Sequence, residues 1–299
     1  MRIRFVALLA ATLFILGAGP AWGHPHILAL AGEGEITFAE LMDELEGVRL
    51  VFVGELHDHE GHHQMQLEVI RALGQRGGAV AVGLEMFKRE DQGALDRWVA
   101  QELEEAEFLP IYQANWSMWP LYRPIFLHAR EKGIPLLGLN IPREISGRVA
   151  REGFASLTDE QRRDLGLGGF SCFVSPAYEE FIRRALGGHA HTRIGSFTNF
   201  CQAQLLWDRV MAVNLLRFLA ANPEHRVVVL VGNGHAWKHG IPAQLAAVSD
   251  APISYRVVMP EIPGRIDRAS ASVHDADFLW LDSGPDGWRP AELEKGVGL

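Results

Sequence analysis

Short apolar runs, each followed by a segment of helical periodicity, constrain the fold of this chain more than any other feature. Four such runs stand at 48–54 (VRLVFVG), 77–87 (GGAVAVGLEMF), 134–140 (IPLLGLN) and 225–235 (HRVVVLVGNGH). Runs so uniformly apolar suit parallel strands that are buried on both faces, with helices as crossovers. We therefore expect an α/β fold with a mostly parallel central sheet and flanking helices.

The helices between these runs are predicted from the spacing of their apolar residues. Apolar residues fall on one helical face within 62–77 and within 92–103, and helices are also expected over about 120–132 and 202–221. Each segment is long enough to connect two neighbouring parallel strands. The alternation of strand and helix therefore extends from about residue 48 to residue 235.

Two segments depart from this alternation. Residues 151–195 contain a Thr-Asp helix start at Thr158 and several glycines, which predicts a helical insertion that is either a lid over a site or structural decoration. Beyond residue 251, two strand-like runs at 253–260 and 277–290 predict a C-terminal strand pair, the second closed by a Gly-Pro-Asp-Gly turn signal.

The amino terminus has the pattern of a secretory signal peptide. Arg2 and Arg4 precede an apolar run over 5–16, which is too short to span a bilayer, and small residues follow up to Gly23. We expect cleavage near Gly23, so that 1–23 is the signal peptide and 24–299 is one mature domain. The expected location is periplasmic or secreted.

Net charge bears on the expected binding partners, and the cysteines bear on whether a disulfide forms. The formal net charge of -9 argues against nucleic acid, whose binding depends largely on phosphate neutralisation. The two cysteines, Cys172 and Cys201, could form a disulfide in an oxidising compartment, or could remain buried thiols.

Polar residues follow each of the four predicted core strands. In open parallel sheets, ligands bind beyond the carboxyl ends of the strands. We therefore expect these side chains to line one ligand pocket: Glu55, His57, Glu85, Arg143 and His235. The alternative for any single residue is a helix cap or a satisfied surface position, since acidic side chains suit the first turn of a helix.

His59, Glu60 and His63 match the HExxH pattern of zinc metalloproteases. That chemistry needs both histidines on one face in the middle of a helix. Here the match begins a few residues after a predicted strand and contains Gly61, so context argues against it. One interpretation places His59, His62 and His63 on the same rim as His57. For His62 and His63 we favour the alternative, that they are solvated loop residues.

Five ordered blocks resemble the ChaN-like haem-binding uptake family, which shares a superfamily with erythromycin esterases and Tiki proteases. The resemblance covers roughly 36–248 and is carried by VFVGELHDHEGHHQMQLEVIRAL, GLEMFKREDQGALDRW, NWSMWPLYRPIFLHAREKGIPLLGLNIPRE, QAQLLWDRVMA and VVVLVGNGHAWKHGIP. It implies an α/β protein of the bacterial envelope that takes part in haem or iron acquisition.

The resemblance also implies how haem is held. Family members bind it through tyrosine in a paired arrangement between subunits, and an anionic oxygen suits ferric iron. The iron-ligand candidates are Tyr178, Tyr122 and Tyr112, and a homodimer is expected. Many family members are lipoproteins that could dock to an outer-membrane receptor, but no cysteine stands near Gly23, which puts a haem receptor as partner in doubt.

Whether the chain is an enzyme stays open from sequence. The hydrolytic branches of the superfamily place a Glu and a His of a GExH motif, a second Glu and a later His in one pocket, and these positions correspond to Glu55, His57, Glu85 and His235. The main expectation is an exported haem-binding protein. The alternative is a hydrolase, either dependent on a divalent metal or using His57 as base, with Arg143 or His235 steadying negative charge. An inert scaffold is a third interpretation.

Overall fold

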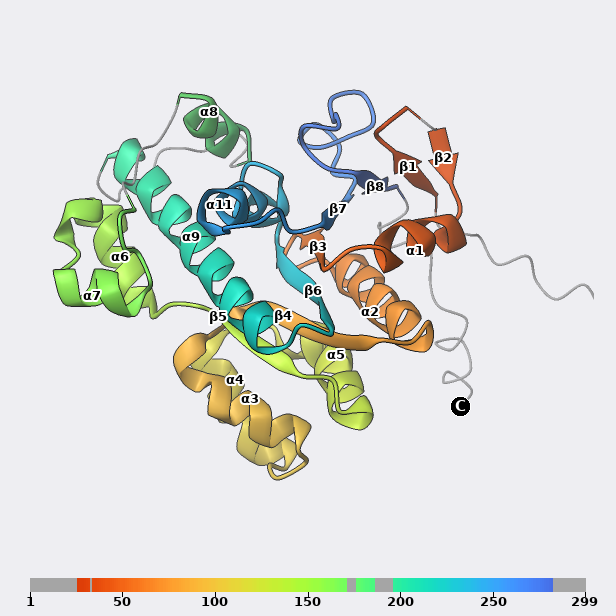
Figure 1. Cartoon of the computed structure of the whole chain (residues 1–299), viewed down its shortest axis with the longest axis horizontal. Helices are drawn as coiled ribbons and strands as arrows, with labels where there is room; N and C mark the ends of the chain where they lie inside the picture. The colour runs from red at the N-terminus through yellow and green to blue at the C-terminus, as the bar shows by residue number, and fades with distance from the viewer. Residues whose placement is uncertain (1–25, 33, 171–175, 186–195, 282–299) are drawn as a thin grey trace, which may run out of the picture.

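The computed structural model describes residues 26–32, 34–170, 176–185 and 196–281. Its centre is an eight-stranded sheet in the order β2-β1-β8-β7-β3-β6-β4-β5 (Figure 1). The strands are β1 (Ile27–Ala29), β2 (Gly34–Ile36), β3 (Leu50–Glu55), β4 (Ala79–Lys88), β5 (Leu136–Asn140), β6 (His225–Gly232), β7 (Tyr255–Pro260) and β8 (Phe278–Trp280).

The sheet is parallel from β8 through to β5. Among the described strands, the antiparallel pairs are β1 with β2 and β1 with β8. β6 lies between β3 and β4, although it follows β5 in the chain. The carboxyl ends of three strands that are distant in sequence therefore meet at one edge of the sheet.

Helices cover both faces of this sheet. They are α1 (Phe38–Glu46), α2 (Glu60–Gln75), α3 (Gln92–Val99), α4 (Glu105–Asn115), α5 (Trp119–Lys132), α6 (Arg143–Glu152), α7 (Asp159–Asp164), α8 (Pro176–Ala185), α9 (Phe197–Ala221), α10 (Asn233–Ala236) and α11 (Ile241–Val248). Among the helices that the structure describes, none combines the length and the apolarity needed to cross a membrane.

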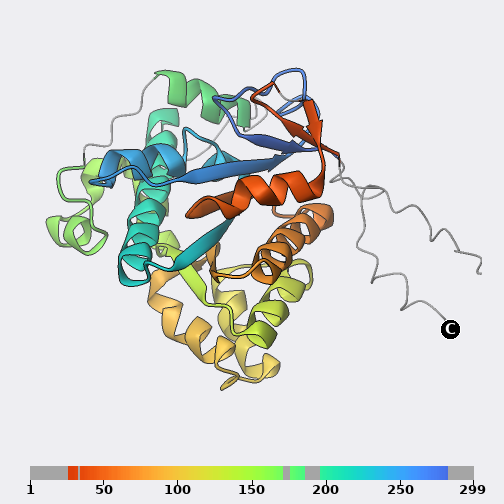
Figure 2. The same cartoon turned by 45° about the vertical axis from the view of Figure 1, so that its right-hand side comes forward.

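Side-chain alternation along the strands creates two cores. Val51 and Val53 of β3 pack with α1, α2 and α5 on one face, whereas Leu50 and Phe52 pack with α9 and α11 on the other. Figure 2 shows α1 and α2 on the opposite side of the sheet from α9. A third, smaller cluster joins α6 and the residues on either side of α7 to α9.

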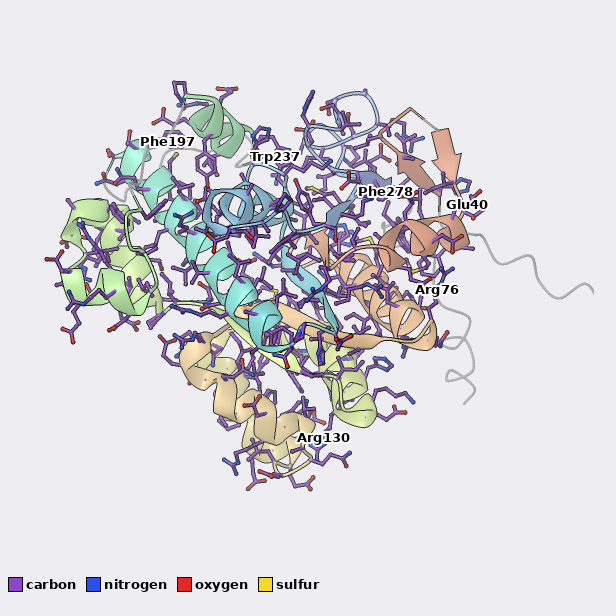
Figure 3. All side chains as sticks on the ribbon, in the orientation of Figure 1. Glu40, Arg76, Arg130, Phe197, Trp237 and Phe278 are labelled. Atoms are coloured by element: carbon purple, nitrogen blue, oxygen red, sulfur yellow. The ribbon has the colours of Figure 1, made fainter. Side chains whose placement is uncertain are left out.

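Local capping and surface pairs fix the ends of several helices. Thr158 caps α7 with a capping box, as its Thr-Asp sequence predicts. At the end of α2, Arg76 bonds to Asp43 at 2.5 Å and to the carbonyl of Ala39 at 3.2 Å, so it ties α2 to α1 (Figure 3). These exposed pairs position the two helices but contribute little free energy each.

The predicted fold class is confirmed, because all four core runs and both C-terminal runs contain strands and the sheet is mostly parallel. Three details differ. The helix predicted over 92–103 ends at Val99. The β1–β2 hairpin was not predicted, because strands of three residues carry too little periodicity to be detected. The Gly-Pro-Asp-Gly turn and the signal peptide lie outside the described residues.

Candidate functional site

A cavity of about 630 Å³ lies beyond the carboxyl ends of β3, β6 and β4. Its walls are mainly apolar and aromatic, and they include Trp116, Met118, Ile182, Phe200, Trp207 and Trp237. Polar residues of the strand ends also line it: Glu55, His57, Glu85 and His235. Apolar walls around a few convergent polar groups are typical of ligand sites.

Glu55, the last residue of β3, is the centre of a buried hydrogen-bond network. One oxygen accepts from the Tyr122 hydroxyl and lies 2.6 Å from Nδ1 of His57, while the other accepts from Gln66 Nε2 at 2.6 Å. Burial alone would raise the pKa of Glu55, but hydrogen bonds and charge from His57 and His63 hold it well below its usual range. Glu55 is therefore a fixed negative charge beneath His57.

His57 is held by Glu55 and presents its other nitrogen to Glu85. Glu55 accepts a hydrogen bond from His57 Nδ1, so the neutral ring carries its proton on that nitrogen. Nε2 of His57 therefore has a lone pair that can accept a proton. Nε2 lies 3.9 Å from Oε1 of Glu85, and the ring meets Trp116 edge-on with centroids 5.0 Å apart. Burial would lower the pKa of His57, but the bond to Glu55 and the charge of Glu85 raise it.

His235, in α10, repeats this arrangement from the opposite side. Its Nδ1 lies 2.6 Å from Asp208 of α9, and Asp208 also accepts from the Tyr178 hydroxyl at 2.8 Å. Its Nε2 lies 3.7 Å from the same Glu85 oxygen that faces His57. Burial would lower the pKa of His235, but the charges of Glu85 and Asp208 raise it to about 9.

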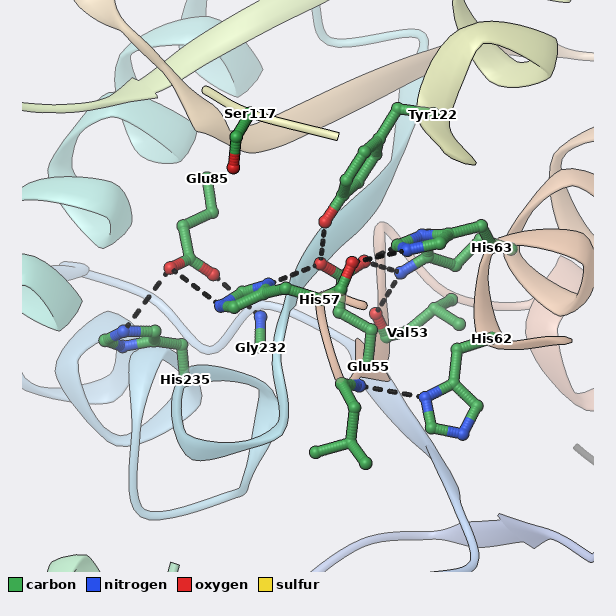
Figure 4. Close-up of polar contacts among 12 residues, drawn as sticks. Val53, Glu55, His57, His62, His63, Glu85, Ser117, Tyr122, Gly232 and His235 are labelled. Atoms are coloured by element: carbon green, nitrogen blue, oxygen red, sulfur yellow. Dashed lines mark hydrogen bonds and ion pairs between the residues drawn. The ribbon is translucent and has the colours of Figure 1, made fainter. Parts of the chain in front are cut away.

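Glu85 therefore lies between His57 and His235 (Figure 4). Each of these histidines also has a carboxylate partner of its own. Its second oxygen accepts from the Gly232 backbone N–H at 2.7 Å. The prediction that Glu85 follows its strand is wrong, because β4 continues to Lys88. Pairing with β6 ends at Leu84, and a shift in register between Leu84 and Lys88 leaves Glu85 directed at the neighbouring strand end.

The expectation that His62 and His63 are solvated is also wrong, since both side chains are buried. α2 begins at Glu60, so both residues belong to its first turn, which packs beneath the end of β3. His62 Nδ1 accepts from the Leu56 backbone N–H at 2.8 Å, and His63 Nε2 lies 2.9 Å from the His57 carbonyl oxygen. They support the loop that carries His57.

The HExxH match lies at the start of α2 rather than in its middle. His59 is the N-cap residue and Glu60 the first helical residue. Both nitrogens of His63 face protein acceptors, Glu55 and the His57 carbonyl. Among the described residues, no cluster of three histidine, cysteine or acidic side chains is arranged to hold a metal ion.

Arg143, the first residue of α6, is the one expected pocket residue that does not line this cavity. It lines a neighbouring cavity of about 400 Å³. Its guanidinium lies over the Trp116 ring, 5.4 Å from the centroid, and donates to the Asn115 carbonyl at 3.4 Å. The two cavities share Glu85, Trp116, Phe200, Gln204 and Trp207. The ends of three strands thus line the large cavity, and the segment after β5 lines the neighbouring cavity.

The three candidate tyrosines all hydrogen-bond inside the protein. Tyr122 donates to Glu55, Tyr178 donates to Asp208, and Tyr112 donates to the Ser117 carbonyl at 2.9 Å. Burial raises the pKa of both Tyr112 and Tyr122. No tyrosine of the described residues lines the cavity. The assignment of a tyrosine to iron stays a prediction.

Comparison with known proteins identifies a family and a solved structure that this chain resembles. A family model described as "Haem-binding uptake, Tiki superfamily, ChaN" matches residues 41–245. The chain belongs to this family. The structure of ChaN of Campylobacter jejuni, described as showing cofacial haem binding, matches with a TM-score of 0.64 at 20% identity and covers 86% of this chain and 96% of that one. At this identity the likeness to the ChaN structure shows a shared fold.

Two further matches are more distant. An erythromycin esterase, EreC, matches with a TM-score of 0.48 at 17% identity, over 80% of this chain and 76% of that one. The protein RETICULATA-RELATED 5 of Arabidopsis thaliana, described as chloroplastic, is 24% identical over 259 residues. The alignment covers 81% of this chain and 35% of the plant protein, so this ChaN-family chain spans about a third of that relative's length.

Sequence reasoning missed three functional neighbours of the strand ends, Asp208, Gln66 and Trp207. Asp208 is the clearest case, because an acidic residue within the apolar stretch LLWDRVMAVNLL is a signal of a buried partner. Gln66 lies three residues after His63 on the same helical face, and its amide spans Glu55 and the Val53 carbonyl. Cys201 is buried, whereas Cys172 lies outside the described residues, so their pairing stays a prediction.

Proposed function

We propose that this chain binds haem in the aromatic-walled cavity and serves haem or iron acquisition. The cavity itself carries the proposal: about 630 Å³ with Trp116, Trp207 and Trp237 in its walls, a size and lining that suit a flat, largely apolar ring. Family membership supports it, and so does the cofacial haem described for the Campylobacter jejuni protein.

The lining of the cavity suits the porphyrin ring, but among the described residues it offers no suitable side chain as a ligand to the haem iron. No described tyrosine faces it, and Nε2 of His57 is crowded, since a Cβ placed on Gly232 would lie 3.1 Å from it. Oε1 of Glu85 also lies 3.9 Å from that nitrogen, so His57 is a poor candidate for an iron ligand. Bound haem supplies the iron and the conjugated ring, whereas the chain's own residues supply apolar contact and exclude water.

Export and the pairing of two chains belong to the same proposal. The arginine-rich, apolar amino terminus supports export to the periplasm with cleavage near Gly23. The cofacial haem binding described for the Campylobacter jejuni protein supports a homodimer. The alternative of a bound divalent metal is supported only by the presence of Glu and His side chains in the site.

A ferric haem titration of the chain from residue 24, followed by absorbance, tests this function. Saturable binding is expected, and Trp207→Leu should weaken it by about tenfold because an aromatic contact is lost. Arg123→Gln, which breaks an exposed ion pair with Glu105, is the matched control and should bind as the wild type does. Absence of saturable binding would refute the proposal.

A hydrolase is the second candidate, and the two histidine–carboxylate pairs that face Glu85 favour it. In such a reaction His57 Nε2 takes a proton from a water molecule, whose oxygen attacks the carbonyl carbon of an ester. The bond from that carbon to the alcohol oxygen then breaks, and the leaving oxygen takes the proton from His57, so that an acid and an alcohol are released. His235, protonated at neutral pH because its pKa is about 9, stabilises the negative charge that forms on the carbonyl oxygen. Clusters of perturbed titratable groups in a cleft are typical of active sites.

Nitrophenyl esters of increasing chain length test this second candidate. Hydrolysis by the wild type should fall by about 10²- to 10⁴-fold in His57→Ala, since general-base catalysis is removed. The same variant should retain haem binding, because His57 does not ligate the iron in the proposal above. Ester hydrolysis that persists in His57→Ala would exclude this site as its source.

A further inference from the structure

The neighbouring cavity differs from the haem cavity in charge. The large cavity has four carboxylates in its lining, from Glu55, Glu85, Asp58 and Asp275, and one arginine, Arg265. The cavity of about 400 Å³ adds Lys88 and Arg143 to the shared wall. Lys88 lies 3.3 Å from Asp91 and is therefore neutralised. Arg143 is the cation that distinguishes this cavity.

The guanidinium of Arg143 has no carboxylate within ion-pair distance in the part of the chain that the structure describes. Its recorded contacts are one long bond to the Asn115 carbonyl and the face of Trp116. A guanidinium has five N–H donors in a planar fork that matches a carboxylate. Arg143 is exposed, so most of these donors face solvent at the edge of the cavity, where a ligand can reach them.

The amino end of α6 adds to the same field. Pro142 is its N-cap residue and offers no side-chain cap. The Ile145 N–H donates to the Pro142 carbonyl at 3.0 Å, and the helix dipole adds partial positive charge at this end. Glu144 also lines the cavity and opposes this field in part. Arg143 and the helix end together make this the more electropositive end of the joined cavities.

Trp116 links the two cavities, because its ring contacts both His57 and Arg143. A ligand that lies against Trp116 can thus place an apolar body in the large cavity and an acidic group beside Arg143. We infer that the Arg143 cavity is a carboxylate subsite, which selects flat apolar ligands bearing an acidic side chain, such as a porphyrin propionate. This inference rests on the proposed haem-binding function.

Iron-free protoporphyrin IX and its dimethyl ester provide the test, since they differ only in the carboxylates. Fluorescence titration of the wild type should show tighter binding of the diacid by about tenfold, the value of one charge-assisted contact. Arg143→Gln should abolish this preference while it leaves binding of the ester unchanged. Arg143→Lys, which keeps the charge but not the planar fork, should retain part of it.

The outcomes separate this inference from the function on which it rests. Saturable binding of diacid and ester with equal affinity would overturn the carboxylate subsite and leave the haem cavity intact. Failure of both porphyrins and of haem to bind would overturn the proposed function itself, and the subsite with it. Arg265→Gln is the comparison variant, and loss of the preference there instead of in Arg143→Gln would also overturn the inference. A merely structural role of Arg143 on Trp116 would weaken both ligands equally.

Discussion

At the scale of single residues, this site holds histidines in opposite protonation states. Burial and the neighbouring His59 lower the pKa of His62 to about 3, and its Nδ1 must stay unprotonated to accept from the Leu56 N–H. The pKa of His235 is instead raised to about 9, because Glu85 and Asp208 outweigh its burial. The difference comes from the partners that the fold supplies, since the residue type is the same.

His62 makes the protein sensitive to acid. Its pKa is depressed in the folded chain, so the unfolded chain binds the extra proton and stability is lost as pH falls below about 6.5. We expect the free energy of unfolding to drop by about 2 kcal/mol between pH 6.5 and about pH 4.5 from this residue. His62→Asn keeps an acceptor that does not titrate and should remove that part of the drop. Urea unfolding of both proteins at several pH values measures it, and identical pH profiles would contradict the assignment.

Glu85 sets the charge of His235. Because the pKa of His235 is raised, its contribution to stability is complete below about pH 6.5 and is lost as pH rises through about 9. Glu85→Gln keeps an acceptor for the Gly232 N–H but removes the charge, so the pKa of His235 should fall by roughly one unit or more. An NMR titration of the histidine ring protons measures this, with Asp208→Asn as the comparison. An unchanged pKa in both variants would show that neither carboxylate controls His235.

At the scale of helices and strands, the close approach of β5 to the end of β4 determines the backbone path near Glu85. Gly138 lies where β4 shifts register, and a Cβ there would be 2.5 Å from the Lys88 carbonyl oxygen. A backbone atom cannot move aside as a flexible side chain can. Glycine at 138 therefore permits the irregular end of β4 that carries Glu85.

Gly138→Ala should destabilise the protein by roughly 1–3 kcal/mol, as other overpacked core positions do. Gly74→Ala is the matched control, because Gly74 lies in α2 with open space around its Cβ position. Alanine is the better helix former there and should add about 0.5–1 kcal/mol. Thermal unfolding followed by circular dichroism compares the two. A neutral Gly138→Ala would mean that β4 and β5 separate at little cost.

At the scale of the whole molecule, ligand binding and stability are linked. The cavity is formed by segments from β3, β4, β6, α9 and the stretch before β8, so a ligand there contacts elements that come together only in the folded chain. A ligand that binds only the folded form stabilises it by mass action. Haem should therefore raise the unfolding temperature in a concentration-dependent way.

Ferric haem at about a hundredfold excess over its Kd should add about 2.7 kcal/mol and raise the unfolding temperature by roughly 5 °C. Trp207→Leu should need about tenfold more haem for the same shift. Differential scanning calorimetry measures both. Spectral saturation without any thermal shift would point to haem adsorbed on the surface or on unfolded chains.

Much of the architecture was predictable from sequence because buried parallel strands leave a strong local pattern. The runs around Val53, Leu84 and Val231 identified β3, β4 and β6, and the polar residues after them identified Glu55, His57 and His235. The short β1–β2 hairpin left no such pattern. Asp208 was not found because its role depends on His235, 27 residues further along the chain.

The fold class could be predicted from the chain alone, since periodicity and strand-end chemistry are local properties. Three features depend on how the strands assemble: Glu85 lies between His57 and His235, His62 and His63 are buried, and Arg143 lines a second cavity. Strand order caused this, because β6 inserts between β3 and β4, and no local pattern specifies which strands become neighbours. The protonation states followed from the same packing, since charge and burial are set by residues far apart in sequence.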